Sequence, residues 1–358
     1  MGARKIVLYT HALAGGGAER ALALLAGGLA ARGLDVLFAT DYSAPENEGF
    51  LGPGVRRANL GRSHVGSIRN LRALLIAEKP DVSISALGAN NVKHATAAIL
   101  AGRSRRAVLS YHGFSVSEPR LLSQLAFQLA PLLTRTTGRT IAVSGALRDN
   151  LVGSWWADPA RTRHIQNPVA WRSPARPPTA QNLRDREPTV LAVGRLAADK
   201  DFLTLIRAFA RIKRPHARLV ILGEGEERAA LQAEIARLEL TARVELPGYL
   251  AQPWAYYERA ACFAVSSRSE SFGMVIVEAL AFGLPVVATD CGGPREILTT
   301  PGLGQLVPVG DEAGLAECIE AALNDPGDPA PRLARAADFS LDRGLDAYEA
   351  LIEEIVAG

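Results

Sequence analysis

Short apolar runs rich in β-branched residues alternate with longer stretches of helical periodicity along this chain, and the pattern occurs twice. In the first half the strand candidates are residues 6–9, 36–39, 82–85, 107–110 and 140–143. The alternation restarts with candidates at residues 189–193, 219–222, 243–246, 262–265 and 286–289. Strands separated by helices form βαβ units and therefore parallel sheets. The sequence predicts an α/β protein with two doubly wound domains.

The length of the chain agrees with two domains, because 358 residues exceed what one hydrophobic core commonly serves. Residues 171–188 are rich in Pro, Arg and polar residues and lack periodicity, which is typical of a linker; a long surface loop is the alternative. We therefore expect an N-terminal Rossmann-like domain over residues 1–168, a linker over 169–188 and a second Rossmann-like domain over 189–340. A C-terminal helix over 341–358 could pack back on the N-terminal domain.

Composition indicates a globular protein in a reducing compartment. Apolar residues make up 48% of the chain and charged residues 22%. The first strand candidate begins too early for a signal peptide to precede it, and the longest apolar helical stretches fall short of the roughly 20 residues that cross a bilayer. The three cysteines, Cys262, Cys291 and Cys318, are odd in number and lack the CxxC spacing of zinc sites. We expect a cytoplasmic protein with reduced thiols.

Charge is unevenly distributed between the two halves. Residues 1–168 hold 20 Lys or Arg against 10 Asp or Glu, whereas the remainder holds 20 against 27. A basic half suggests contact with something anionic, such as a lipid-linked pyrophosphate, an acidic glycan or the inner face of the cytoplasmic membrane; a solvated surface is an equal alternative. No aromatic residues interleave with the basic ones, so we expect no nucleic-acid partner.

The helix candidate at residues 119–133 carries more apolar side chains than an amphipathic stripe requires. It could lie in a membrane interface. A buried core helix is the preferred interpretation, because interfacial helices are commonly rich in Lys and Arg on the polar face and this one is not.

Two carboxylates frame the start of a helix in the second half. The run ESFGMVIVEAL spans residues 270–280, after the strand candidate at 262–265. Glu270 precedes the helix and Glu278 lies two turns into it, so the two can hold different parts of one ligand. The amides of Phe272, Gly273 and Met274 should point at an anion, such as a sugar diphosphate. The alternative is a capping acid followed by an exposed helical glutamate.

These motifs together resemble the retaining glycosyltransferases of family 4. The resemblance rests on GGGAER at residues 15–20, Asn167-Pro168, GRLAADK at 194–200, GEGEER at 223–228 and the long run from 270 to 296. It covers most of the chain and implies the GT-B fold, in which two Rossmann-like domains face each other across a cleft. It also implies a nucleotide-sugar donor, UDP- or GDP-linked, a glycan or lipid-linked acceptor, no cofactor and no bound metal ion.

The resemblance assigns roles to residues that follow strand ends. Arg195 and Lys200 are implied to bind the donor diphosphate, for which a guanidinium fork and an ammonium point charge are suited. Glu270 is implied to bind a ring hydroxyl of the donor, and His112 to lie near the transferred sugar; a structural histidine is the alternative. We take Glu270, His112, Lys200 and Arg195 as the candidate catalytic residues.

Further donor contacts are expected from the backbone of several loops. Gly16 and Gly17 let the backbone approach a phosphate or the acceptor, although Arg20 stands where a dinucleotide fingerprint has its third glycine, and a plain turn is the alternative. Gly223 belongs to the GEGEER motif. By resemblance, the backbone of Tyr249 and Leu250 frames the base.

No protein nucleophile is obvious, because Glu270 is implied to bind a hydroxyl rather than to attack the anomeric carbon. We therefore expect front-face substitution, in which the leaving phosphate takes the acceptor's proton. A nucleotide-sugar epimerase of the same fold and a non-catalytic sugar-nucleotide-binding homologue remain alternatives. Ser144 and Asn167 match recurrent family positions, and capping is the preferred interpretation of both.

Overall fold

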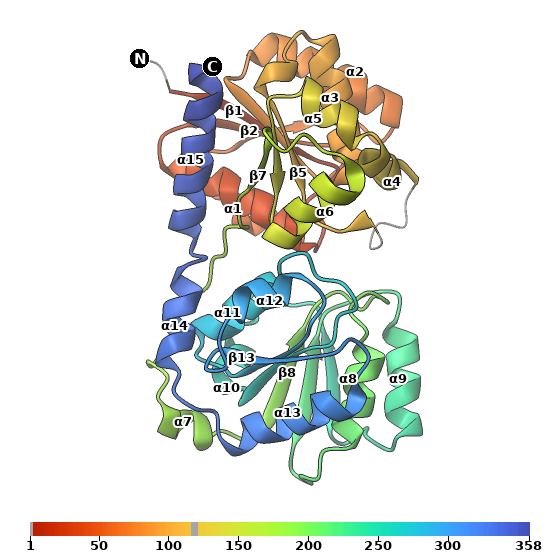
Figure 1. Ribbon diagram of the computed structural model, residues 1–358, viewed down its shortest axis with the longest axis vertical. Coiled ribbons are helices and arrows are strands. Elements are labelled where there is room, and N and C mark those ends of the chain that lie inside the picture. Colours follow the sequence, from red (N-terminus) through yellow and green to blue (C-terminus); the bar gives the residue numbers. More distant parts are fainter. Residues whose placement is uncertain (1–2, 116–120) are drawn as a thin grey trace. The chain divides into compact units, whose positions relative to one another are not determined.

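The computed structural model describes residues 3–115 and 121–358, which form two compact units (Figure 1). Unit 1 comprises residues 1–169 and 340–358, and unit 2 comprises residues 170–339. Each unit is built around its own sheet, of seven strands in unit 1 and six in unit 2, and every strand pairing is parallel. The predicted α/β class is therefore confirmed.

Unit 1 has the strand order β3-β2-β1-β4-β5-β6-β7. Its strands are β1 (Lys5–Thr10), β2 (Asp35–Thr40), β3 (Arg56–Asn59), β4 (Val82–Ala86), β5 (Ala107–Tyr111), β6 (Arg139–Ala142) and β7 (Thr162–His164). Its helices are α1 (Gly17–Ala31), α2 (His64–Glu78), α3 (Gly88–Leu100), α4 (Leu121–Gln128), α5 (Ala130–Thr136), α6 (Gly145–Trp155) and α15 (Leu341–Ala357), with short 3₁₀ turns η1 (Glu48–Phe50) and η2 (Ser104–Arg106).

Unit 2 repeats the doubly wound plan, with the strand order β10-β9-β8-β11-β12-β13. Its strands are β8 (Thr189–Val193), β9 (Arg218–Leu222), β10 (Val244–Gly248), β11 (Cys262–Val265), β12 (Val286–Thr289) and β13 (Gly304–Val307). Its helices are α7 (Ala180–Arg184), α8 (Phe202–Ala210), α9 (Arg228–Arg237), α10 (Trp254–Arg259), α11 (Met274–Ala281), α12 (Gly293–Ile297), α13 (Glu312–Asn324) and α14 (Ala330–Ala337).

The C-terminal helix α15 completes the core of unit 1. Its apolar face contributes Leu345, Tyr348, Leu351, Ile352 and Ile355 to the cluster that also contains side chains of β1 and α1. The contact with α1 is close, because a β-carbon on Gly28 would lie 2.6 Å from the Leu345 methyl carbons. The last residues of the chain thus stabilise its first domain.

Two segments differ from their predicted form. The single helix expected at residues 119–133 is interrupted at Leu129, so that α4 and α5 are separate helices; its first residues lie outside the described range. Pro131 at the start of α5 explains the break, since proline fits only the first turn of a helix. The segment expected to be a linker holds α7, which begins with a capping box formed by Thr179 and Asn182.

Each sheet changes the direction of its winding once. In unit 1 the change occurs between β1 and β4, and in unit 2 between β8 and β11. The loops that leave these neighbouring strands run to opposite faces of the sheet, which opens a crevice at their carboxyl ends where ligands commonly bind. The motifs at residues 15–20, 194–200 and 270–280 all follow strands that flank one of these two points. No helix within the described residues is long and apolar enough to cross a membrane.

Candidate functional site

An ion pair joins the two loops at the switch point of unit 2. Lys200 follows β8 and Glu270 follows β11, and the Lys200 Nζ lies 2.6 Å from the Glu270 Oε2. Burial alone would lower the pKa of Lys200, but the carboxylates of Glu270 and Asp199 outweigh it and hold that pKa above its ordinary value. The amine is therefore charged at neutral pH. The structure brings together two residues that are 70 positions apart in the sequence.

The loop around Lys200 is fixed by residues that follow the neighbouring strand β11. The Ser266 hydroxyl donates to the Lys200 carbonyl oxygen at 2.9 Å, and the Arg268 amide donates to the Asp199 carbonyl oxygen at 2.8 Å. The Arg268 guanidinium also donates to Asp201, which caps α8. These contacts hold the ammonium group in place before a ligand arrives.

Glycines allow the loops after β8 and β9 to touch along their backbones. A β-carbon on Gly223 would clash with the Gly194 carbonyl group, and one on Gly225 would lie 2.7 Å from the Leu196 carbonyl carbon. The Leu196 amide donates to the Glu224 carbonyl oxygen at 2.9 Å. The GRLAADK and GEGEER motifs thus form one structural unit, with Gly223 at its point of closest approach.

The start of α11 depends on a similar approach by the loop after β12. Gly273 caps the helix with a φ of 100°, a left-handed conformation that favours glycine. The Gly293 amide donates to the Glu270 carbonyl oxygen at 2.7 Å, and a β-carbon on Gly293 would lie 2.6 Å from the Phe272 nitrogen. The first-turn amides of α11, which have no acceptor inside the helix, follow directly after Glu270.

Glu278 is a buried side chain and not the solvent-exposed helical glutamate that was the alternative. It is fully buried, and its Oε2 accepts a 2.8 Å hydrogen bond from the Tyr257 hydroxyl. Tyr257 is buried too and stacks on Phe263 and Phe282. Direct contact between Glu278 and a ribose stays a prediction, and Tyr257 is a partner that the sequence did not reveal.

The remaining donor candidates of unit 2 are more accessible. Arg195 has a 60% exposed side chain and lies 3.6 Å from Asp199 in a loose ion pair. Tyr249 and Leu250, directly after β10, are both more than a third exposed. Met274 and Phe272 are buried, and the Phe272 ring packs edge-on against Phe339.

No group of three or more potential metal-ligating side chains occurs in the described part of the chain. Asp199 and Asp201 have the Asp-x-Asp spacing found at some metal sites. Their carboxylates are already engaged, since Asp199 approaches Lys200 and Arg195, and Asp201 caps α8 while binding Arg268.

In unit 1 the glycine loop is held at the β1–β4 switch point. Gly16 caps α1, and Gly17 is its first residue. The side chain of Asn47, which is 1% exposed, donates to the carbonyl oxygens of Ala14 and Gly16. The Glu19 carboxylate folds back over this turn, where it would meet a β-carbon on Gly16. Glu19 therefore shares the space in which an anion was expected.

His112 follows β5 in the same unit and is held by its own strand. Its Nε2 lies 2.9 Å from the Ser110 hydroxyl, which in turn hydrogen-bonds Tyr348 of α15. Burial lowers the pKa of His112 to about 4, so the imidazole is neutral at pH 7. Residue Leu87, which follows β4, has a φ of 77°, an uncommon conformation for a residue with a side chain.

Of the two suggested caps, only one is observed. The Ser144 hydroxyl accepts from the Leu147 amide at 3.1 Å and caps α6, as expected. The Asn167 side-chain oxygen is buried and has no hydrogen-bond partner among the described residues, so the capping interpretation of Asn167 is wrong.

Two family models match consecutive parts of the chain. The one described as Glycosyltransferase Family 4 matches residues 15–170, and the one described as Glycosyl transferases group 1 matches residues 178–338. The chain belongs to this glycosyltransferase family. The family 4 match includes Gly16, Gly17 and His112, and the group 1 match includes every candidate of unit 2.

Two curated glycosyltransferases are identical to the chain at about a third or more of the positions in the parts that align. The lipopolysaccharide core biosynthesis glycosyltransferase LpsE of Rhizobium meliloti is 34% identical over 171 residues, which are 46% of this chain and 49% of LpsE. The N-acetylgalactosamine-N,N'-diacetylbacillosaminyl-diphospho-undecaprenol 4-alpha-N-acetylgalactosaminyltransferase of Campylobacter jejuni is 39% identical over 137 residues, 38% of this chain and 37% of the relative. The chain thus spans about half or less of the curated relatives it matches.

Solved structures show the GT-B fold of this glycosyltransferase over nearly its whole length. Anabaena HepE in complex with UDP-glucose superposes with a TM-score of 0.84 at 23% identity, covering 98% of this chain and 99% of HepE. The sucrose-phosphate synthase of Thermosynechococcus elongatus superposes with a TM-score of 0.81 at 20% identity, covering 99% of each chain.

Proposed function

We propose that this glycosyltransferase moves a sugar from a UDP- or GDP-linked donor to a hydroxyl of a glycan or lipid-linked acceptor, in the synthesis of a cell-surface polysaccharide or glycolipid. The observation that carries the proposal is the Lys200–Glu270 pair at the switch point of unit 2. The family membership supports transfer. One bacterial relative is named for lipopolysaccharide core biosynthesis and the other for transfer to a diphospho-undecaprenol-linked sugar, and HepE was crystallised with UDP-glucose.

The donor diphosphate would bind to Lys200, Arg195 and the first-turn amides of α11. A diphosphate entering this loop competes with Glu270 for the Lys200 ammonium group, because the two side chains are already in contact. Glu270 would then turn to a ring hydroxyl of the sugar. The cations and amides stabilise the negative charge that grows on the departing phosphate, which is where such groups accelerate transfer.

The transfer would proceed with retention of configuration and without a metal ion. The acceptor oxygen bonds to the anomeric carbon as the bond from that carbon to the donor phosphate breaks, and the acceptor's proton passes to the departing phosphate oxygen. Lys200, Arg195 and the helix amides supply the positive charge that a divalent cation supplies in other transferases. The neutral ring of His112 would lie near the sugar as a hydrogen-bonding group rather than as a cation.

The donor-binding residues are tested with a panel of UDP-, GDP-, ADP- and dTDP-sugars, measuring thermal stabilisation and nucleotide release with and without EDTA. We expect one donor class to raise the melting temperature, with EDTA having no effect. Lys200→Ala should strongly reduce this shift, whereas Lys213→Ala on the exposed surface of the same unit should retain it. A full shift in the Lys200→Ala variant would contradict the assignment.

Two other activities would bind the same donors. An epimerase converts the donor without an acceptor, and a non-catalytic homologue binds it unchanged. Chromatography of the products after incubation with donor and acceptor separates the three: a new glycoside supports transfer, an isomerised nucleotide sugar supports epimerisation, and unchanged donor supports binding alone.

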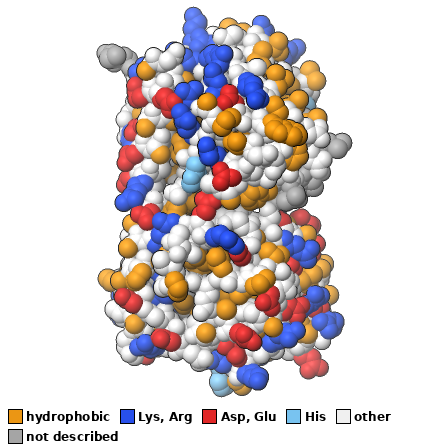
Figure 2. Space-filling model, in the orientation of Figure 1, with side chains coloured by type: hydrophobic (Ala, Val, Ile, Leu, Met, Phe, Trp, Pro, Cys, Tyr) orange, Lys and Arg blue, Asp and Glu red, His pale blue; other side chains and the backbone are white. Residues whose placement is uncertain are grey.

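We also propose that unit 1 contacts an anionic surface, such as the inner face of the cytoplasmic membrane. On the face shown in Figure 2, Lys and Arg side chains gather over unit 1 with apolar side chains beside them. Leu125, Leu132 and Trp156 are 42%, 57% and 69% exposed, and Arg135 donates to the Trp156 carbonyl oxygen. Co-sedimentation with phosphatidylglycerol vesicles but not with phosphatidylcholine vesicles would support this contact. Absence of co-sedimentation with both kinds of vesicle would exclude it.

A further inference from the structure

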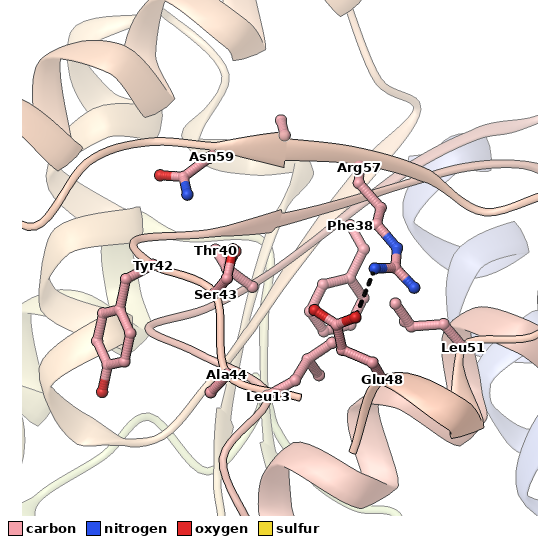
Figure 3. A pocket seen from close by; sticks show the side chains of 11 residues that line it. Leu13, Phe38, Thr40, Tyr42, Ser43, Ala44, Glu48, Leu51, Arg57 and Asn59 are labelled. Carbon is pink, nitrogen blue, oxygen red and sulfur yellow. Dashed lines mark hydrogen bonds and ion pairs between the residues drawn. The ribbon is translucent and has the colours of Figure 1, made fainter. Parts of the chain in front are cut away.

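A pocket of about 230 Å³ opens at the carboxyl ends of β2 and β3 in unit 1 (Figure 3). None of the residues assigned above to donor binding or catalysis lines it. Its volume is sufficient for one hexose ring but too small for a nucleotide. The pocket is therefore a candidate site for a ligand other than the nucleotide.

The walls of the pocket combine an apolar surface with hydrogen-bonding groups. Leu13, Phe38 and Leu51 belong to the buried core of unit 1 and supply the apolar part. Thr40 and Asn59 lie at the ends of β2 and β3 and supply a hydroxyl and an amide; Figure 3 shows them on the side opposite to Leu51. A sugar ring presents the same two surfaces, since its C–H groups form apolar patches and its hydroxyls form a polar rim. Ligand sites commonly consist of such a mainly apolar cavity with a few directed polar groups.

An ion pair at one end of the pocket favours a neutral ligand. The Arg57 guanidinium lies 2.9 Å from the Glu48 carboxylate, and the two side chains are 54% and 36% exposed. Each keeps unused hydrogen-bonding capacity, because a guanidinium has five N–H donors and a carboxylate about four acceptor positions. Adjacent sugar hydroxyls can accept from the one and donate to the other. Because the two charges cancel, an anionic group gains less from this pair than from an unpaired arginine.

The pocket is joined to the glycine loop at the switch point of unit 1. The Tyr42 amide donates to the His11 carbonyl oxygen at 3.2 Å, and the Asn47 amide donates to the Leu13 carbonyl oxygen at 2.9 Å. The Asn47 side chain continues to the Gly16 carbonyl oxygen. A ligand in the pocket is thus held on the same backbone segment that precedes α1.

We propose that this pocket binds one neutral monosaccharide unit of the acceptor glycan. The inference rests on the proposed transferase function, to which it adds the chemical class of the acceptor and its subsite. The acceptor sugar lies with its C–H face on the apolar wall, while Arg57, Glu48 and Asn59 hold its hydroxyls.

The direct test uses methyl glycosides of glucose, galactose, mannose and N-acetylglucosamine as probes, with saturation-transfer NMR on the full-length protein. We expect at least one of them to bind, and Arg57→Ala and Asn59→Ala each to weaken that binding about tenfold. Arg56→Ala is the matched control: it lies next to Arg57 on β3, and it pairs instead with Asp35 and Glu78. Binding of none of the probes at tens of millimolar, or binding that both pocket variants retain, would overturn the proposal.

A second measurement separates this proposal from the transferase assignment. The pocket variants should retain the thermal shift caused by the nucleotide sugar, because the residues proposed to bind its diphosphate belong to unit 2 and the pocket residues belong to unit 1. In transfer assays they should raise the acceptor KM about tenfold and leave the donor KM unchanged. If the methyl glycosides bind in the pocket but no nucleotide sugar stabilises the protein, the transferase assignment fails and the sugar site stands. If a nucleotide sugar stabilises the protein and none of the methyl glycosides binds, the transferase assignment stands and the sugar-site proposal fails.

Discussion

Lys200 is predicted to bind the donor diphosphate directly, rather than only to hold Glu270 in place. The two roles differ in their effect on nucleoside diphosphate binding. At 2.6 Å and an effective dielectric constant of about 20, the attraction within the Lys200–Glu270 pair is about 6 kcal/mol before desolvation. Both side chains are only about a fifth exposed, so much of this attraction is offset by the cost of removing them from water.

A diphosphate must replace Glu270 as the partner of Lys200, and this gives the two single variants opposite effects. Lys200→Ala removes a charge-assisted hydrogen bond to the phosphate, which is worth about 1.5–3 kcal/mol, so the dissociation constant of UDP or GDP should rise roughly 10- to 100-fold. Glu270→Gln releases the ammonium group from its competitor. Binding of the nucleoside diphosphate, which has no sugar for Glu270 to hold, should therefore become tighter.

Isothermal titration of the preferred nucleoside diphosphate into the two single variants and the double variant completes a double-mutant cycle. If Lys200 binds the diphosphate, Lys200→Ala weakens binding even in the Glu270→Gln background. The reasoning is refuted if Lys200→Ala has no effect in that background, because Lys200 would then act only through Glu270. Lys213→Ala should leave the dissociation constant unchanged throughout.

Three further predictions concern stability and loop geometry. Tyr257→Phe removes the hydrogen bond to the buried Glu278 carboxylate and should lower the free energy of unfolding by about 1–3 kcal/mol in urea titrations, with an unchanged value contradicting the observed contact. Gly293→Ala places a β-carbon against the backbone of the α11 start and should weaken donor binding at least tenfold, whereas Gly302→Ala, which has open space around it, should not. Because burial depresses the pKa of His112 to about 4, the unfolded state takes up its proton first as pH falls. His112 alone should therefore lower the free energy of unfolding by about 2 kcal/mol as pH falls from above 6.5 to 5, in addition to the contribution of buried His94, whose pKa burial lowers to about 3. A titration midpoint of His112 near 6.5 by NMR would disprove this.

The strands predicted from the sequence include every strand inside the two sheets and one edge strand, β10. Every predicted run coincides with an observed strand to within two residues at either end. The three strands that were not predicted, β3, β7 and β13, all lie at an edge of their sheet. A strand that is not covered on both faces does not need a continuous apolar run, so its sequence resembles that of a loop. The arginine-rich β3 is the extreme case, since three of its four side chains are exposed.

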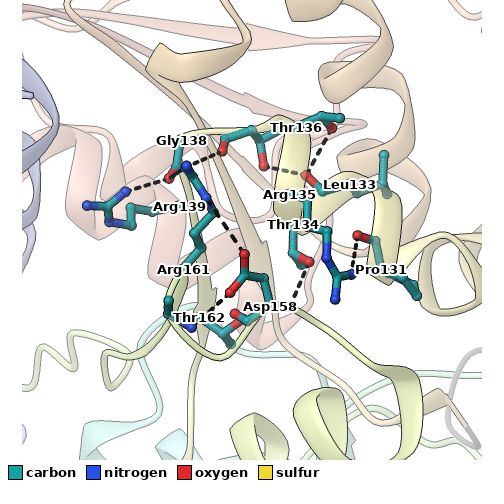
Figure 4. Close-up of polar contacts among 12 residues, drawn as sticks. Pro131, Leu133, Thr134, Arg135, Thr136, Gly138, Arg139, Asp158, Arg161 and Thr162 are labelled. Carbon is teal, nitrogen blue, oxygen red and sulfur yellow. Dashed lines mark hydrogen bonds and ion pairs between the residues drawn. The ribbon is translucent and has the colours of Figure 1, made fainter.

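Edge strand β7 shows what replaces apolar packing. The Arg161 guanidinium, directly before the strand, donates to the carbonyl oxygens of Thr137 and Gly138 and lies 3.8 Å from Asp158 (Figure 4). The Thr162 hydroxyl donates to the Asp158 carbonyl oxygen at 2.7 Å. The contacts with Thr137 and Gly138 span 24 and 23 positions, so they exist only once the sheet is formed. Local sequence patterns therefore contained no signal for them.

The candidate site also contains features that the linear sequence indicates and contacts that depend on the folded structure. The resemblance to family 4, rather than spacing alone, selected Arg195, Lys200, Gly223, Glu270 and Gly273, because each belongs to a motif that can be recognised in the linear sequence. The direct contact between Lys200 and Glu270 depends on β11 pairing with β8, a consequence of strand order that periodicity does not encode. Tyr257 was missed for the same reason, since it comes from α10 and meets Glu278 only across the packed interior of unit 2.

The burial of Glu278 changes what its eight-residue spacing from Glu270 can mean within this chain. A carboxylate with no exposed surface, bonded to a tyrosine that stacks on two phenylalanines, fixes the rotation of α11 about its axis. That rotation sets the direction of the amides at the helix start, four residues earlier, and of the loop that carries Glu270. Glu278 can thus prepare the donor site through the helix whether or not it touches the ribose. Tyr257→Phe distinguishes the two roles, because a positioning effect would weaken binding of a nucleoside diphosphate and of inorganic pyrophosphate alike, whereas loss of a ribose contact would affect only the nucleotide.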